Sequence, residues 1–285
     1  MYTHTPSEEH LARLAKITDL PIVVPTSESE ARQACRESVA FLGHRYLRQC
    51  LETRPSELRW IQLLGGGVDH IGVDFGRLPY VVTRTTFASG VIAWHAFALL
   101  LSLVRGLHDQ AAPLLPLPRK AMIIGYGEIG AALGQRLQRN GIEVHGVRRS
   151  AGAPRRVATA FTRGTGRTIS RRWMRFSSAL PLNDATEGFF GADCLARLKA
   201  TAVLVVVGRA RTVDLVALPE MLPRIGGVAF DAPDSPNLEA CPNVLISPWN
   251  AGRYPERAAD TEQFMEAQLA RFVAGERLEN VVRFN

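Results

Sequence analysis

Residues 121–149 read AMIIGYGEIGAALGQRLQRNGIEVHGVRR, and this stretch decides the fold. It begins with a short apolar run that is typical of a buried parallel strand. An amphipathic helix follows, and a second strand is expected over 142–147. Between the first strand and the helix, Gly125, Gly127 and Gly130 are spaced as GxGxxG. The order strand, glycine turn, helix and strand is that of a dinucleotide-binding unit.

Each glycine has a steric reason in such a unit. The first lets the chain turn sharply, the second lets the backbone approach a pyrophosphate, and the third lets helix and strand pack closely. The helix N-terminus presents N–H groups and the positive end of its dipole to the phosphates. The turn is therefore predicted to bind a cofactor through Gly125, Gly127, Glu128, Ile129 and Gly130. The alternative is a glycine-rich turn in another kind of α/β unit.

The end of the second strand indicates which dinucleotide is bound. An NAD site usually places Asp or Glu about 20 residues past the glycines, where it binds the adenosine ribose 2′-hydroxyl. Here residues 146–150 read GVRRS, without a carboxylate. Guanidinium groups form charge-assisted, often bidentate bonds with phosphate oxygens, so Arg148 and Arg149 suit a 2′-phosphate. We expect NADP(H) rather than NAD(H); the alternative is a solvated surface pair of arginines.

Length and composition limit the class of protein. The chain has 285 residues, enough for two domains, and is 46% hydrophobic and 21% charged, as globular proteins are. No apolar run has the length of a membrane span, and the N-terminal residues lack a signal pattern, so neither a membrane nor export is expected. The four cysteines have no CxxC spacing, which favours reduced thiols in a cytoplasmic protein and no metal site.

The positive charge is local. Seven arginines and no acidic residue lie within 151–183, so this segment accounts for the whole net charge of +7. A charge confined to one segment, with few interleaved aromatic residues, does not favour nucleic acid as a partner. Residues 151–175, rich in Arg, Ala, Gly, Thr and Ser, stand where a strand, a helix and the start of another strand are expected. A short frame-shifted stretch is the favoured explanation; a basic phosphate-binding loop and a divergent natural loop are the alternatives.

The remaining pattern alternates strands with helices, which predicts parallel sheets. Before the glycine unit, helices are expected at 8–17 and 28–36, and strands at 21–25, 39–43, 59–64 and 80–84. Elsewhere, helices are expected at 90–105 and 256–274, and strands at 201–207, 227–230 and 244–246. Such a sheet normally begins with a strand, whereas this chain begins close to its first helix, which suggests a missing N-terminal strand. The helix at 90–105 is apolar nearly all round, so it should be buried. A subunit interface is one place where it could be buried.

Several segments, in order, resemble the D-isomer-specific 2-hydroxyacid dehydrogenase family, especially its glyoxylate/hydroxypyruvate reductase-like branch. Together with the glycine unit they cover nearly the whole chain except 151–175. They are LRWIQLLGGGVDHI (58–71), GVIAWHAFALLLSLVRGL (90–107), ALPLNDATEGFFGADCLARLK (179–199), VLVVVGRARTVD (203–214), NVLISPWNAG (243–252) and AGERLENVVRF (274–284).

The resemblance implies an α/β fold with two Rossmann-like or flavodoxin-like domains built on parallel sheets. A discontinuous substrate domain would comprise 1–88 and 258–285, with an NAD(P)-binding Rossmann domain, 89–257, inserted into it. The chemistry would take place between the two domains, at the carboxyl ends of the strands. The family also implies a homodimer and a small 2-oxoacid or 2-hydroxyacid as substrate.

Reduction of a 2-oxoacid requires that its carboxylate be bound, its carbonyl polarised and a proton supplied. Backbone N–H groups of Gly66 and Gly67 can approach a carboxylate closely because glycine has no Cβ; a plain turn is the alternative. Arg209 follows the strand expected at 201–207, and its permanent charge can bind the carboxylate and polarise the carbonyl. In the resembling family these positions bind substrate, and the arginine is catalytic; the alternative for Arg209 is a surface arginine.

Three further positions match the family's cofactor site. Asp231 follows the strand expected at 227–230 and corresponds to the aspartate that binds the nicotinamide carboxamide. Leu180 and Pro181 correspond to a pair that packs beside the adenosine. These roles are implied by the resemblance alone.

The proton donor departs from the family pattern. The family has histidine at the position of Trp249, and indole cannot act as a general acid near neutral pH. The glutamate that orients that histidine also has no counterpart, because Asp234 and Glu239 are not in register. His70, His95 and Tyr254 are the candidate substitutes, although a histidine beside an apolar helix is more often structural. The sequence thus predicts an NAD(P)-dependent 2-oxoacid reductase with impaired or altered acid–base chemistry, or else an inactive NADP-binding sensor or interaction protein.

Overall fold

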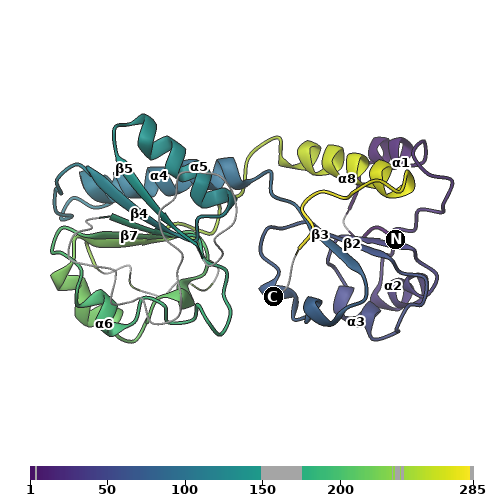
Figure 1. The fold of residues 1–285 in the computed structure, drawn as a ribbon, viewed down its shortest axis with the longest axis horizontal. Helices are drawn as coiled ribbons and strands as arrows, with labels where there is room; N and C mark the ends of the chain where they lie inside the picture. Colours follow the sequence, from purple (N-terminus) through teal and green to yellow (C-terminus); the bar gives the residue numbers. More distant parts are fainter. Residues whose placement is uncertain (4, 149–174, 233, 235–237, 239–240, 283–285) are drawn as a thin grey trace. The chain divides into compact units, whose positions relative to one another are not determined.

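The structure is a computed structural model. It describes residues 1–3, 5–148, 175–232, 234, 238 and 241–282. The chain divides into two compact units (Figure 1). Unit 1 comprises Met1–Phe87 with Tyr254–Asn285, and unit 2 comprises Ala88–Arg253. A discontinuous first unit with a second one inserted into it is the fold expected from the sequence, while the roles of the two units in binding stay predictions.

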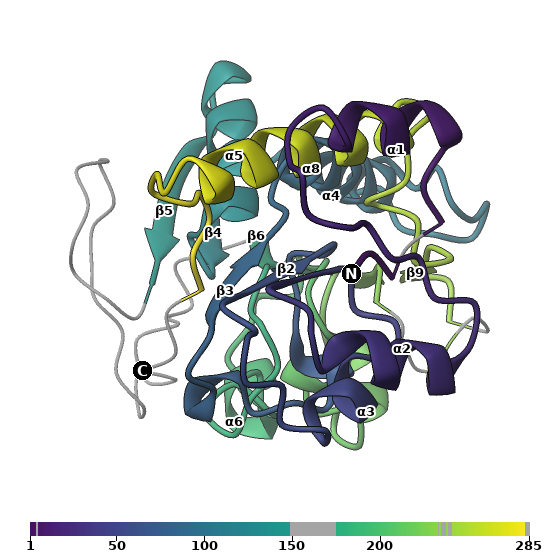
Figure 2. The same cartoon turned by 90° about the vertical axis from the view of Figure 1, so that its right-hand side faces the viewer.

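Unit 1 is built on a small parallel sheet with helices on both faces. Its strands lie in the order β1 (Ala40–Leu42), β2 (Trp60–Leu63) and β3 (Val81–Arg84). Helices α1 (Glu8–Leu14) and α8 (Arg257–Val273) cover one face, while α2 (Glu28–Cys35) and α3 (Leu47–Leu51) cover the other (Figure 2). Successive residues of β2 point to opposite faces: Trp60 packs in the cluster with α1 and α8, and Ile61 in the cluster with α2 and α3.

The first two helices begin where the sequence predicts. Ser7 and Ser27 are their N-caps, and each side-chain oxygen accepts a backbone N–H three residues later. Acidic residues in both first turns complement the positive end of the helix dipole. The short helix α3 was not expected, because its five residues are too few to give a periodic pattern.

One expectation for the start of the chain differs from the structure, and the missing N-terminal strand stays a prediction. Residues 1–3 lie along the outer edge of β1, with a parallel bridge between Tyr2 and Leu42 and a hydrogen bond from Thr3 N to Leu42 O of 2.7 Å. The strand expected at 21–25 is wrong, since this stretch has no strand assigned to it. Val23 O accepts Tyr2 N at 2.9 Å, and the two prolines of the stretch have no N–H to donate to a neighbouring strand.

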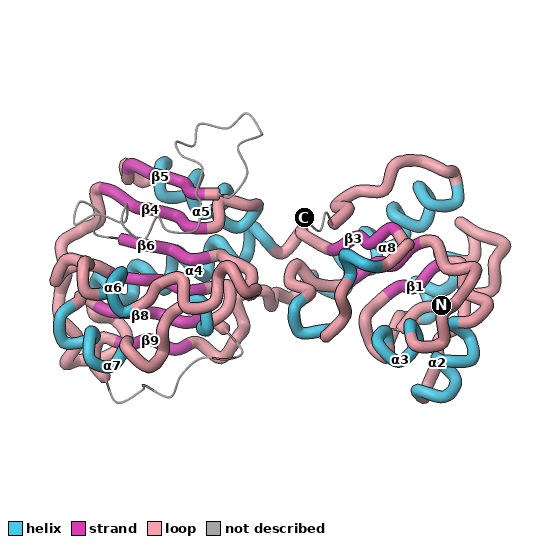
Figure 3. Tube along the Cα trace, turned by 60° about the horizontal axis from the view of Figure 1, so that its bottom comes forward, coloured by secondary structure: helices cyan, strands magenta, loops and turns pink. Residues whose placement is uncertain are grey.

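Unit 2 contains a six-stranded parallel sheet in the order β5-β4-β6-β7-β8-β9 (Figure 3). The strands are β4 (Lys120–Ile124), β5 (Glu143–Val147), β6 (Arg175–Ser178), β7 (Val203–Val206), β8 (Gly227–Phe230) and β9 (Val244–Ile246). The chain leaves β4 to one side for β5 and then continues on the other side with β6. This reversal is a topological switch point, and open parallel sheets bind ligands at the carboxyl ends of the strands there.

Helices cover both faces of this sheet. On one face lie α4 (Ser89–Arg105) and α5 (Glu128–Arg139), packed on Ile123, Val203 and Val205. The shorter α6 (Ala192–Leu195) and α7 (Leu218–Met221) lie on the other, against the alternate side chains of the same strands. Helix α4 thus buries one face inside unit 2, whereas Trp94 on its other face is 60% exposed, so the expected burial is only partly met. In the part of the chain that the structure describes, no helix is long and apolar enough to cross a membrane.

The arginine-rich segment lies mostly outside the described residues. The expectations for 151–174, including a frame-shifted stretch and a basic phosphate-binding loop, therefore stay predictions. The structure resumes with β6, which pairs with β4 on one side and β7 on the other. The sequence is thus incorporated into the sheet again from Arg175.

Candidate functional site

The glycine turn joins β4 to α5 at the switch point. Gly125 has φ +89°, and a Cβ there would lie 2.9 Å from the carbonyl of Ala179. A Cβ on Gly130 would lie 2.5 Å from Gly125 O, so only glycine allows helix and strand this close. A Cβ on Gly127 would meet nothing within 4 Å. The first and third glycines are required by the fold itself, whereas the second faces open space, where a pyrophosphate would fit.

The start of α5 is arranged like an anion-binding helix end. Gly127 is its N-cap and has no side chain to cap the first N–H groups. Glu128 and Ile129 form the first turn, and Ile129 packs towards the core shared with α4. Glu128 Oε2 lies 3.5 Å from Ser89 Oγ at the start of α4. The two predicted side chains thus position the helix, and the backbone of the turn is the part suited to phosphate.

Tyr126, inside the turn, supports it from behind. Its ring lies over Gly146 of β5, and its hydroxyl end over Gly134 of α5, where any Cβ would overlap the ring. Both Gly125 N and Tyr126 N donate to Val147 O, at 3.0 and 2.9 Å. The sequence analysis did not single out this contact. The sequence feature that could have predicted this contact is an aromatic residue within the turn, together with a glycine in each of the two following elements.

The carboxyl ends of the central strands meet around this turn. Ala179 and Leu180, directly after β6, lie against Gly125, and a Cβ on Gly208 would overlap Leu180 O. Leu180 also packs against the core on the α6 side. Pro181 follows it, and its carbonyl accepts the hydroxyl of Thr186 at 2.6 Å. The predicted pair Leu180 and Pro181 is therefore next to the turn.

Of the two arginines predicted to bind a 2′-phosphate, only Arg148 lies within the described residues. Arg148 is half-buried and follows β5 directly. It is therefore at the carboxyl end of the strand next to β4, where an adenosine ribose would lie in a doubly wound sheet. Arg149 lies outside the described residues.

Arg209 follows β7 on the same edge and is half-buried. Its Nη1 donates to Gly208 O at 3.0 Å, and its carbonyl accepts from Thr212 Oγ1 at 2.7 Å. Asp234 fixes the next two residues, because its two oxygens accept Ala210 N at 2.9 Å and Arg211 N at 3.1 Å. Asp234 was expected to be out of register with the missing glutamate, and here its oxygens hold the loop that follows Arg209.

Asp231 anchors the loop that carries Trp249. The carboxylate is 3% exposed and lies directly after β8. Its Oδ1 accepts Ser247 Oγ at 2.5 Å and Asn250 N at 2.9 Å, and its Oδ2 accepts Ala251 N at 3.0 Å. Three of the four acceptor positions of the carboxylate are thus used by this loop.

Trp249 itself has an unusual backbone conformation. Its φ is +49°, in the left-handed region that a bulky residue rarely adopts. Its N–H donates to Ser247 O at 2.8 Å, and the residue is 52% exposed. The loop anchored by Asp231 therefore presents the indole to solvent, and no acid is available from this side chain.

The structure distinguishes the three candidate substitutes for the proton donor. His95 Nε2 lies 3.0 Å from Ser247 Oγ and 3.7 Å from Asp231 Oδ1. Tyr254 belongs to unit 1, where its hydroxyl donates to Asp260 at 2.6 Å. Desolvation and this hydrogen bond raise the pKa of Tyr254 to about 12, which makes it a poor acid. The side chain of His70 lies outside what the structure describes.

The glycine loop of unit 1 follows β2. Arg84 Nη1 donates to Gly66 O at 2.6 Å, and Gly66 is exposed. A Cβ on Gly66 would lie 3.7 Å from Thr85 O, an ordinary contact. The loop therefore does not itself require glycine at 66, and the binding role of Gly66 and Gly67 stays a prediction.

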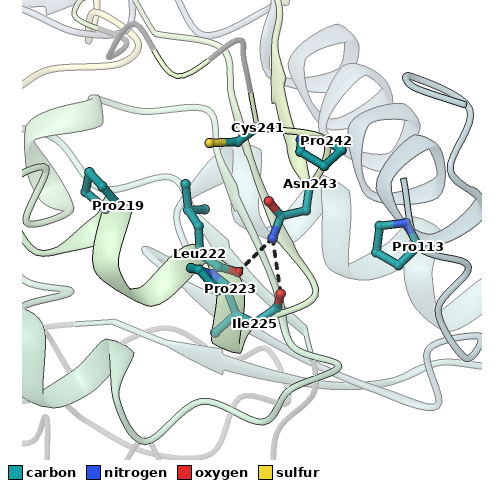
Figure 4. Close-up of a pocket in the computed structure, with 8 residues that line it drawn as sticks. All are labelled: Pro113, Pro219, Leu222, Pro223, Ile225, Cys241, Pro242 and Asn243. Atoms are coloured by element: carbon teal, nitrogen blue, oxygen red, sulfur yellow. Dashed lines mark hydrogen bonds between the residues drawn. The ribbon is translucent and has the colours of Figure 1, made fainter. Parts of the chain in front are cut away.

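One cavity, of about 370 Å³, lies at the opposite edge of the sheet (Figure 4). Ile225 and Asn243, which line it, come shortly before β8 and β9, at their amino ends. Asn243 Nδ2 donates to Leu222 O at 2.8 Å and to Ile225 O at 3.2 Å. This cavity is separate from the glycine turn, and its other walls are mostly proline.

Comparison with known proteins identifies unit 2. Residues 115–251 match the model of the D-isomer specific 2-hydroxyacid dehydrogenase, NAD binding domain. The chain carries a D-isomer specific 2-hydroxyacid dehydrogenase NAD-binding domain. The match spans all six strands of the unit 2 sheet, so the glycine turn and the ends of β7, β8 and β9 are parts of this domain.

Relatives support the same family. An uncharacterised protein from the mprR 3′ region of Streptomyces coelicolor is 31% identical over 178 residues, 58% of this chain and 64% of that protein. The chain thus covers less than two thirds of that relative's length. A glyoxylate reductase of Korarchaeum cryptofilum is 27% identical over 291 residues, 87% of this chain and 82% of that protein. The likeness to a glyoxylate reductase agrees with the resemblance that the motifs indicated.

A solved structure confirms the fold over both units. The NADPH-dependent glyoxylate/hydroxypyruvate reductase of Sinorhizobium meliloti, in complex with NADP and malonate, has a TM-score of 0.76 and 22% identity. The comparison covers 99% of this chain and 95% of that one. Both units therefore share the two-domain fold of the D-isomer specific 2-hydroxyacid dehydrogenases.

Proposed function

We propose that this chain is an NADP(H)-dependent oxidoreductase that reduces a small 2-oxoacid of the glyoxylate or hydroxypyruvate kind, with altered acid–base chemistry. The observation that carries the proposal is the carboxyl edge of unit 2. There, the open position at Gly127 lies beside the uncapped start of α5, and Arg209 follows β7 on the same edge. One part suits a dinucleotide and the other suits a carboxylate.

The cofactor would be held by the backbone of the glycine turn, with Leu180 and Pro181 beside it and the remaining acceptor position of Asp231 for an amide. When bound, a reduced nicotinamide supplies the hydride. A 2′-phosphate would lie near Arg148 and Arg149, which supports NADP(H) over NAD(H). The structural relative with NADP bound is consistent with this preference.

The substrate carboxylate would be bound by the guanidinium of Arg209 and by backbone N–H groups at Gly66 and Gly67. Arg209 would also polarise the carbonyl oxygen as negative charge develops on it. The names of two relatives, a glyoxylate reductase and a glyoxylate/hydroxypyruvate reductase, support the size and charge of this substrate. We also propose a cytoplasmic homodimer; the four free cysteines suit a reducing compartment.

Trp249 makes the first prediction. The wild type is expected to oxidise NADPH slowly when glyoxylate or hydroxypyruvate is added, faster with NADPH than with NADH, because Trp249 supplies no proton and a substitute donor must act from a less favourable position. Trp249→His places an imidazole on the loop anchored by Asp231 and should raise kcat, at most by the roughly 10² to 10⁴-fold that general acid catalysis contributes. Steady-state absorbance assays at a fixed NADPH concentration measure kcat of the wild type and of Trp249→His.

Two outcomes would count against parts of this proposal. A wild type with kcat near the median for enzymes, about 10 s⁻¹, would mean that Trp249 is no impediment. No oxidation with either 2-oxoacid, despite tight NADPH binding by fluorescence titration, would favour the second candidate. That candidate is a non-catalytic NADP-binding sensor or interaction protein, and the exposed indole of Trp249 is the observation that favours it.

A further inference from the structure

Helix α4 brings a histidine to the carboxyl edge of unit 2. His95 lies in the second turn of α4, and its side chain is 25% exposed. Its Nε2 is 3.0 Å from Ser247 Oγ, at the end of β9, and Ser247 Oγ donates to Asp231 Oδ1 at 2.5 Å, at the end of β8. Three elements thus form one chain of hydrogen bonds from an imidazole to a buried carboxylate.

The hydrogen bonds from His95 through Ser247 to Asp231 determine which imidazole nitrogen can exchange a proton. A carboxylate only accepts, so the Ser247 hydroxyl proton points to Asp231, and its lone pairs accept from the imidazole. Nε2 is therefore the nitrogen that stays protonated, and Nδ1 is the one that gains and loses a proton. Among the described residues, Nδ1 has no hydrogen-bonding partner in the structure.

The charged groups around α4 favour this arrangement. Asp231 is the carboxylate against the imidazole, 3.7 Å from Nε2. From α5, Glu128 lies against Ser89, and the Arg136 guanidinium lies over the Trp94 ring. A buried carboxylate linked through a serine orients the ring, as a third group orients the base in a catalytic triad.

We propose that His95, oriented by Ser247 and Asp231, is the proton donor of the reductase, in place of a residue at position 249. This assignment rests on the proposed function. The carbonyl carbon of the 2-oxoacid accepts a hydride from the reduced nicotinamide, which leaves oxidised, and the π electron pair moves to oxygen. That oxygen takes the proton of His95 Nδ1, which water later restores. Ser247 is a positioning residue in this scheme.

His95→Gln is the second prediction. Glutamine keeps a donor near Ser247 Oγ but cannot supply a proton, so kcat with glyoxylate should fall by at least about 10²-fold. The decline of the wild-type rate at alkaline pH, where the imidazole is neutral, should disappear. His145→Gln is the matched control, because His145 in the same unit also contacts a carboxylate, Glu143 at 2.7 Å, and should leave kcat unchanged. NADPH titration and Tm verify that each variant folds.

A second measurement needs no turnover. In long-range ¹H–¹⁵N spectra of the protein without cofactor, neutral His95 should be protonated at Nε2, and Ser247→Ala should change this tautomer preference. Ser247→Ala should also lower kcat with little change in KM, as the loss of a positioning residue does, which decides the question if His95→Gln does not fold. Protonation at Nδ1 in the neutral ring would overturn the assignment.

The results separate this proposal from the function on which it rests. If His95→Gln keeps the wild-type kcat and the same alkaline decline, His95 is not the donor, and the reductase proposal stands. If the wild type oxidises NADPH with neither 2-oxoacid, the reductase proposal fails and the assignment of His95 fails with it.

Discussion

The glycines of the turn differ in what a single methyl group would contact. At Gly130 a Cβ would lie 2.5 Å from the backbone oxygen of Gly125, which cannot move without shifting the turn. At Gly127 the same atom would enter open space, and the backbone, φ −83° and ψ −153°, is accessible to alanine. The motif GxGxxG thus combines one residue needed for packing with one needed for ligand approach.

Alanine substitutions at these two positions make the third prediction. Gly130→Ala should lower the free energy of unfolding by about 1–3 kcal/mol, as overpacking does, and reduce Tm. Gly127→Ala should keep the wild-type Tm and weaken NADPH binding by about tenfold or more, or about 1.4 kcal/mol, because its methyl group lies where the pyrophosphate approaches. Thermal unfolding and fluorescence titration measure the two effects.

Gly191→Ala is the control for Gly127→Ala, since Gly191 is also an N-cap glycine with negative φ, at the start of α6. It should change neither Tm nor NADPH affinity. Equal NADPH affinity in Gly127→Ala and the wild type would contradict the proposed position of the pyrophosphate.

At the scale of single residues, sequence reasoning works where a residue type has one physical use. Glycine at fixed spacing after a strand predicted the turn, and arginine after a buried strand predicted a residue at the sheet edge. The relation between His95, Ser247 and Asp231 could not be predicted, because it joins residues 152 apart in sequence through side-chain geometry. Tyr126 against Gly134 and Gly146 was missed for the same reason.

At the scale of elements, α1 and α8 are joined by a charged cluster. Glu266 accepts His10 Nδ1 and Arg13 Nε, both at 2.7 Å, and Glu262 accepts Arg13 Nη2 at 3.0 Å. Desolvation by itself raises the pKa of Glu266, but the hydrogen bonds from Arg13 and His10 outweigh it, and the pKa is lowered. These bonds connect the first helix of the chain to the last one.

The fourth prediction is the acid sensitivity of this connection. A carboxyl whose pKa is lower in the folded protein contributes stability above its unfolded value, 4.5, and this contribution is lost as pH falls through the folded pKa. The Tm of Glu266→Gln should therefore be lower than wild type at neutral pH and converge with it once the pH has fallen through the folded pKa of Glu266. Glu37→Gln, exposed in the turn after α2, should follow the wild type throughout; a constant Tm difference for Glu266→Gln would contradict the linkage.

Elements were predicted well where the apolar pattern was long or bounded by caps. The helices at 28–36, 90–105 and 256–274 and the apolar strands of unit 2 are present within a few residues of their expected limits. The strand prediction for 21–25 was wrong because the stretch has the apolar composition of a strand, whereas its prolines limit pairing. Helix α3 was not predicted because its five residues are too few to show a helical period.

At the scale of the whole molecule, the two edges of the unit 2 sheet have different properties. The carboxyl edge gathers the glycine turn, Arg209, Asp231 and the loop of Trp249. The amino edge holds the cavity beside Ile225 and Asn243. Because ligands of open parallel sheets bind at the carboxyl ends, the cavity is not the place expected for the cofactor.

Hydrogen–deuterium exchange with and without NADPH provides the fifth prediction. At 100 times Kd, a ligand that binds the folded state adds about 2.7 kcal/mol of stability. Protection should therefore increase most in peptides that cover 125–131 and 206–210, where amides surround the proposed site. Peptides that cover 222–226, at the amino edge, serve as the internal control. Stronger protection at 222–226 than at the glycine turn would place the cofactor at the cavity instead.

The sequence by itself determined the glycine turn, the alternation of strands and helices, the family resemblance and the lack of an acid at Trp249. These follow from local rules, in which residue type and spacing limit the backbone and the available chemistry. Only the tertiary structure decided that Asp234 holds the loop after Arg209, that residues 1–3 lie along β1, and that His95 lies beside Asp231. Such relations depend on which strands are neighbours and on a few ångströms of side-chain position, neither of which is encoded by a short stretch of sequence.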